Sequence, residues 1–332
     1  MPPLTRLAAV ARIFLPTVLY IFAHPAAAHV KWFSESGLSV YPPTFSYSEL
    51  LTAITLLLLV LVVAAWLNGR LVKPGARYFL PWCQHTKPLG FALLLLSIYF
   101  LGCAFSGVIL APHIAASPGV TALCIGLQAL VSILLLLNRA QELMAGLILS
   151  LFLVAGIVDV TFLLEYVLLL GIAWLLYSTR QIPQEHTMRL LRCALGLSLA
   201  GLALTEKLLQ PALALNVLQQ YPLNFMAHMG VPFSDIWFVL AAGMVELLVG
   251  LLLVLGWLVR TTTVVLLALM IASNSYFVMI DNHALALMEF IGHLPVFAVG
   301  ILLLSYRSLE RSSAPARSAD VAERELSLES GQ

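Results

Sequence analysis

Five polar side chains stand within or at the ends of apolar stretches in the C-terminal half of the sequence: Glu206, Glu246, Asn274, Glu289 and His293. Glu289 and His293 are four residues apart, so on a helix they share one face and come within hydrogen-bonding reach. Ionisable groups at membrane depth are costly, and a functional role is the first expectation for them. We therefore predict that the five residues form a buried polar site. Interhelical hydrogen bonds that only fix the helix packing are the alternative.

Four histidines form a second candidate set, because each falls in a segment predicted to face the outer side of the membrane: His29, His113, His228 and His283. Imidazole, carboxylate and thioether groups in one layer suit copper or another late first-row metal. An N-terminal His29 would add its α-amine as a chelating group, which resembles the start of periplasmic copper proteins. No fixed metal-binding spacing relates the four residues, so interfacial histidines without a ligand role are the alternative.

The elements that would position these residues are membrane helices. The chain is 61% hydrophobic and 10% charged, whereas a soluble domain has about 25% charged residues. This composition predicts an all-α, polytopic membrane bundle. A net charge of +1 without a basic patch gives no indication of nucleic-acid binding. Motifs for nucleotides, haem or zinc peptidases are absent, so neither a substrate nor a redox centre is indicated.

The N-terminal 28 residues have the order of a secretory signal peptide. Arg6 and Arg12 precede an apolar core at 13–23, and Ala26 and Ala28 occupy the −3 and −1 positions of a cut after Ala28. Residues 29–45 would then be a periplasmic segment that begins with His29. An uncleaved helix is the alternative.

Apolar runs predict about nine helices of membrane-spanning length after the signal. They lie near 46–67, 89–110, 119–137, 142–158, 160–177, 190–206, 235–258, 262–280 and 284–304. Basic residues cluster in alternate connections, at 70–87, 139, 180–192 and 260, which predicts that these connections are cytoplasmic. The chain is thus expected in a bacterial-type inner membrane, with a periplasmic N-terminus and a disordered cytoplasmic tail at 308–332.

A weak internal repeat divides the apolar region. Glu165-Tyr166 matches Glu289-Phe290, and Gln128 falls roughly where Glu246 does. We predict two four-helix units in the same orientation, at 87–180 and 189–307, behind a leading helix and cytoplasmic loop at 46–86. Apolar sequences align easily, so a chance similarity is the alternative.

The second unit resembles a known family in three short motifs: Glu206-Lys207, Gly230-Val231-Pro232 and Glu246-Leu-Leu-Val-Gly250. The same order is found in the DoxX-like family of small four-helix membrane proteins. The resemblance covers mainly residues 190–307, with a weaker repeat at 87–180. It implies an architecture more than a chemistry, because the family does not share one established activity.

Three classes of function remain open. The first is an outward-facing His/Glu site that handles a metal ion such as copper, or a small solute, with a periplasmic metal or redox partner. The second is a membrane subunit of a quinone-linked oxidoreductase, because some DoxX-like proteins are similar to the membrane part of a thiosulfate–quinone oxidoreductase. The third is a non-enzymatic scaffold or assembly factor surrounded by membrane lipid.

The charge distribution predicts the membrane orientation directly. A phosphatase reporter, which is active only outside the cytoplasm, should be active when inserted at Ser117 and inactive when fused after Arg307. Enzyme assays on intact cells measure the two fusions side by side. The reverse pattern of activity would contradict the predicted threading of the chain.

Overall fold

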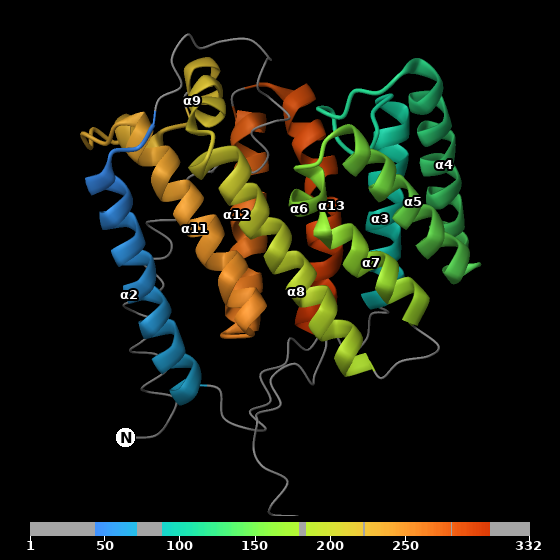
Figure 1. Ribbon diagram of the computed structural model, residues 1–332, viewed down its shortest axis with the longest axis horizontal. Coiled ribbons are helices and arrows are strands. Elements are labelled where there is room, and N and C mark those ends of the chain that lie inside the picture. Colours follow the sequence, from blue (N-terminus) through green and yellow to red (C-terminus); the bar gives the residue numbers. More distant parts are fainter. Residues whose placement is uncertain (1–43, 72–87, 179–183, 222, 280, 306–332) are drawn as a thin grey trace, which may run out of the picture.

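The computed structural model describes residues 44–71, 88–178, 184–221, 223–279 and 281–305 (Figure 1). The predicted signal peptide, His29 and the predicted tail lie outside these ranges. The regular elements that the structure describes are all helices. Eight of them are long and apolar enough to cross a membrane. The predicted polytopic membrane bundle is therefore confirmed.

The helices follow one another closely along the chain. They are α2 (Tyr47–Leu71), α3 (Pro88–Phe105), α4 (Pro118–Leu137), α5 (Gln141–Val158), α6 (Phe162–Glu165), α7 (Val167–Ser178), α8 (Gln184–Leu202), the π-helix η3 (Ala203–Leu208), α9 (Pro211–Gln220), α10 (Phe225–His228), α11 (Asp235–Leu255), α12 (Val259–Met279) and α13 (His283–Ser305). The long helices are joined by short connections at several points, so that neighbours in sequence pack as neighbours in space.

The structure differs from the prediction at 160–177, where one helix was expected. The chain instead forms the four-residue α6 and the twelve-residue α7, separated at Tyr166, whose backbone (φ −117°, ψ 25°) is not helical. The amide of Leu168 donates to Ser198 Oγ on α8 at 2.7 Å. This bond gives a partner to the Leu168 amide, which the break in the helix would otherwise leave without a hydrogen bond inside the bundle.

Eight helices pack in a closed circuit. In the order α3, α4, α5, α7, α8, α11, α12 and α13, each helix contacts the next, and α13 contacts α3. The leading helix α2 lies outside this circuit against α11 (Figure 1). Asn68 near the end of α2 accepts a hydrogen bond from the backbone amide of Leu258, at 3.0 Å.

The circuit interlocks the two predicted units. The last helix of each predicted unit packs against the first helix of the other, because α7 contacts α8 and α13 contacts α3. The same packing order occurs in α3, α4, α5 and α7 as in α8, α11, α12 and α13. Side chains from 87–180 and 189–307 can therefore meet in common sites.

One glycine allows the close contact between the units at α6 and α8. A Cβ atom on Gly201 would lie 2.7 Å from the carbonyl oxygen of Leu164, which is closer than real Cβ contacts allow. Small residues at such crossings let membrane helices approach each other, and the gain comes from backbone packing. Gly201 thus fixes the distance at which the neighbouring polar groups of α6 and α8 meet.

Replacing this glycine should loosen the contact. Gly201→Ala is expected to lower stability by about 1–3 kcal/mol, because an extra methyl group is forced against backbone. Gly146→Ala is the matched control, since a Cβ on that helical glycine of α5 meets nothing within 4 Å. Thermal unfolding of the two variants in detergent gives the comparison. Equal effects of the two substitutions would contradict the proposed role of Gly201.

Candidate functional site

The buried ionisable groups Glu165, Glu206, Lys207, Glu289 and His293 lie toward one end of the bundle. This polar end carries the connections 106–117 and 159–161, the helices α9 and α10, and residues 281–282, and it is the upper end in Figure 1. There α8 continues into η3, which extends the predicted helix by two residues beyond Glu206. The π-helix contains three consecutive buried polar residues, Thr205, Glu206 and Lys207. Such π-helical turns are frequent at functional sites.

Lys207 forms an ion pair inside the bundle. Its Nζ donates to Glu246 Oε2 on α11 at 2.6 Å, and the two side chains are only 4% and 15% exposed. Glu206 also lies within electrostatic reach of Lys207. Gly243 makes room for this contact, because a Cβ there would lie 3.1 Å from the Cβ of Lys207. The pair therefore joins η3 to α11 at the level of the buried carboxylates.

A small cavity lies on the other side of this ion pair. Its volume is about 30 Å³, and both Glu246 and Glu165 line it, together with Ser198 and Gly292. Most of its wall is apolar, and Glu165, Glu246 and Ser198 are the polar residues that could hold a water molecule in a space of this size. The cavity thus places carboxylates of both predicted units around one internal space.

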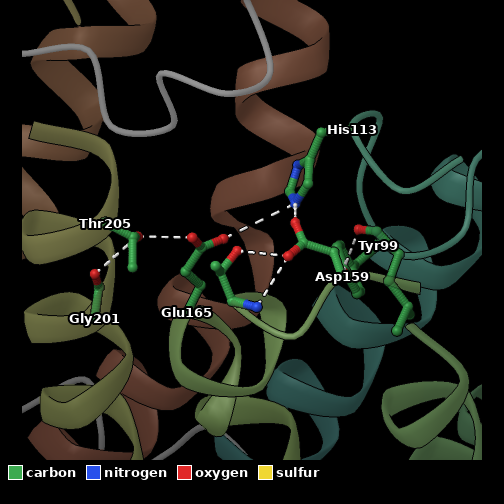
Figure 2. Close-up of polar contacts among 8 residues, drawn as sticks. Tyr99, His113, Asp159, Glu165, Gly201 and Thr205 are labelled. Atoms are coloured by element: carbon green, nitrogen blue, oxygen red, sulfur yellow. Dashed lines mark hydrogen bonds and ion pairs between the residues drawn. The ribbon is translucent and has the colours of Figure 1, made fainter. Parts of the chain in front are cut away.

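His113 and two acids form a cluster beside Glu165. Figure 2 shows His113 between Asp159 and Glu165, with its Nε2 atom 3.9 Å from one oxygen of each carboxylate. The other oxygen of Glu165 lies 2.7 Å from the hydroxyl of Thr205. The cluster therefore connects a loop of the first unit to η3 of the second.

The loop that carries His113 is held by buried hydrogen bonds. The Tyr99 hydroxyl donates to the carbonyl of Leu110 at 2.8 Å, and the amide of Leu110 donates to Gln128 Oε1 at 2.9 Å. Gln128 Nε2 donates in turn to the carbonyl of Val108 at 2.9 Å. These bonds fix three successive peptide groups of the loop, so His113 follows an ordered stretch of backbone.

A further polar group lies between α12 and α13. Ser273 donates to the Glu289 carboxylate, and Asn274 Nδ2 lies 2.8 Å from His293 Nδ1. The same amide nitrogen donates to the carbonyl of Met270, also at 2.8 Å. Asn274 is the donor to the ring, so the ring proton is assigned to Nε2. The i,i+4 pair of α13 is thus tied to α12, a partner that its spacing did not predict.

A groove of about 400 Å³ runs beside this group between α12 and α13. Its polar lining consists of Asn274, Ser275 and His283. Its apolar lining is Ile271, Val278, Ala286, Leu287, Phe290 and Phe297. Ile271 and Leu287 are more than half exposed, so the groove opens on the apolar outer surface that faces lipid in a membrane.

The structure distributes the predicted buried site over two cavities. Glu246 lines the internal cavity and Asn274 lines the groove, while Glu206, Glu289 and His293 are fully buried nearby. The convergence of the five residues on one outward-facing cavity stays a prediction.

The predicted outer histidines occupy separate places. His113 lies in the acidic cluster and His283 at the groove, whereas His228 ends α10 and His29 lies outside the described residues. Across the described ranges, no group of three or more His, Cys, Asp or Glu side chains is arranged to hold a metal ion. The copper hypothesis therefore has no described site to support it.

Sequence reasoning did not include Glu165 and Thr205 in the site. Glu165 is fully buried in an apolar stretch, so the cost of burying charge, which selected Glu246, applies to it equally. Thr205 had no such signal, because a threonine hydroxyl is common in membrane helices. Its role follows only from its contact with Glu165, 40 residues away in sequence.

The chain was compared with known families. Residues 187–278 match the DoxX family model. The match covers η3, α9, α10 and α11, so the DoxX segment contains the Lys207–Glu246 pair, Asn274 and most of the groove helix α12. It confirms the predicted resemblance over this segment. No curated protein and no solved structure matches the chain.

Removing one partner of the ion pair should be destabilising. Lys207→Met is expected to cost about 3 kcal/mol, because it leaves the Glu246 carboxylate buried without its cation. The double variant Lys207→Met/Glu246→Met should recover most of that loss. Thermal unfolding in detergent gives both values.

The matched control for this prediction is an exposed ion pair. Arg189 and Glu185 form an i,i+4 pair at the opposite end of α8, and Glu185→Ala should change stability by less than about 1 kcal/mol. If Lys207→Met were as stable as Glu185→Ala, the prediction that the buried ion pair stabilises the bundle would be contradicted.

Proposed function

We propose that this protein is a membrane component of quinone-linked electron transfer, in which the groove between α12 and α13 binds a lipid-soluble quinone. The main support is the groove itself, which joins an apolar, lipid-facing opening to polar side chains. The membrane-spanning helices and the DoxX segment give the coarser frame for this function.

The lining of the groove suits the chemistry of a quinone. Its volume of about 400 Å³ lies in the range of about 300–1,000 Å³ that is usual for small-molecule sites. Phe290 and Phe297 offer aromatic faces for a planar ring, and the exposed Leu287 side leads to the lipid that holds the tail. Ser275 and His283 supply hydrogen-bonding groups for the carbonyl oxygens.

Proton-exchanging groups lie directly behind the groove. Reduction of a quinone to a quinol adds two electrons and two protons to the carbonyl oxygens. His293 contacts the groove residue Asn274, and Glu289 lies one turn away on the same helix. These residues are suited to hold and transfer protons. We assign the electrons to a partner redox protein, the partner class expected from the sequence.

A groove-filling substitution provides the test. Ser275→Trp should abolish binding of a short-chain quinone to the purified full-length protein in lipid nanodiscs, because the indole would occupy the groove. Binding is measured by photolabelling with an azido-quinone and by competition with the parent quinone. Labelled peptides should map to α12 and α13.

The chain offers a closely matched control at Ser150 on α5. Ser150 and Ser275 are both exposed, and each hydroxyl donates to the carbonyl four residues earlier at 2.8 Å. Ser150→Trp should leave quinone binding unchanged. Equal binding by the two tryptophan variants, or no binding by the wild type, would reject the quinone function.

A further inference from the structure

We propose that Asp159, His113 and Glu165 form a proton port, through which the polar-end surface exchanges protons with the buried Lys207–Glu246 pair. This inference goes beyond the proposed function, because a port to the buried pair does not require that the groove bind a quinone. Its essential residues come from the first unit, outside the segment that matches DoxX.

The three groups form a path of increasing burial. The Asp159 side chain is 31% exposed, His113 is 12% exposed and Glu165 is fully buried. Both steps between them are 3.9 Å long from nitrogen to oxygen. That distance exceeds a hydrogen bond, so a proton crosses when the ring tilts toward one acid or through one intervening water. Both acids face the same ring atom, Nε2. In the tautomer with its proton on Nδ1, this nitrogen can accept a proton from one acid and then release it to the other.

The internal cavity completes the path toward the DoxX segment. Glu165 and Glu246 line the same cavity of about 30 Å³, and about 10–15 Å³ of such space suffices for one water molecule. The hydroxyl of Ser198 adds a polar group to its wall. A water in this space can bridge the two carboxylates, and Glu246 is directly paired with Lys207.

The port is held in place from both sides. Tyr99 and Gln128 fix the backbone at Leu110, which adopts a positive φ of 61°, a strained conformation for a residue with a branched side chain. On the opposite side Thr205 holds the Glu165 carboxylate against η3. A proton route needs donor and acceptor groups held at fixed positions, and these contacts hold His113 and Glu165 more firmly than a loosely packed surface loop would.

The test measures how fast the buried carboxylate responds to pH. The full-length protein in nanodiscs is exposed to a rapid drop in pH, and infrared spectra follow its carboxylate bands. The bands removed by Glu165→Gln and by Glu246→Gln identify the two reporters. His113→Phe should slow the response of the Glu246 band by about tenfold or more, since a general acid–base group typically contributes 10²–10⁴ in rate.

Two further variants separate proton transfer from structural support. His186→Phe changes an exposed histidine near the opposite end of the bundle and should leave the rate unchanged. His113→Ala should be slow, and added imidazole should restore its rate, which a purely structural role would not allow.

The proposal is overturned by any of three results. The first is a wild-type rate of the Glu246 band in both His113→Phe and Glu165→Gln. The second is a rate of His113→Ala that does not depend on imidazole. The third is a Glu246 band that does not respond to external pH. If His113→Phe does not fold, the imidazole experiment on His113→Ala decides alone. None of these measurements involves a quinone, so failure of the port and failure of the quinone site are distinguishable.

Discussion

The bundle depends on the burial of a lysine and a glutamate that neutralise each other. A charge inside an apolar environment is costly unless it is paired and hydrogen-bonded. Lys207 and Glu246 meet this condition across η3 and α11, because η3 continues α8 and carries the lysine into the bundle. Gly243 leaves room for the lysine, and the internal cavity lies beside Glu246.

The ion pair also relates the two proposed sites to each other. On one side, Glu246 shares the internal cavity with Glu165 and so with the His113 cluster. On the other side, Gly292 and Pro295 of α13 line the same cavity beside His293, whose ring contacts Asn274 at the wall of the groove. A change in the charge of the ion pair would therefore alter the electrostatic environment of both the His113 cluster and the groove. The arrangement suits a process in which proton movement and ligand binding are linked.

Hydropathy and charge were sufficient to predict the long helices and the burial of Glu289 and His293, because both follow from the cost of polar groups in lipid. They could not predict the break at Tyr166, which depends on a bond from Leu168 to Ser198 on another helix. They also could not predict which buried groups meet. Glu289 and His293 share a face as predicted, yet the bonds described for them run to Ser273 and Asn274. The groove is a product of side-chain packing and has no periodic signal in the sequence.

The two units use equivalent positions for different purposes. Gln128 on α4 falls roughly where Glu246 does in the internal repeat, and both residues reach toward the segment that follows the first helix of their unit. The neutral amide of Gln128 can only donate and accept hydrogen bonds, and it fixes the backbone of the His113 loop. Glu246 instead holds a charged side chain and can itself take up a proton. An amide at the first position thus gives a rigid support, whereas a carboxylate at the second gives a group that titrates, and the proton port that we propose needs one of each.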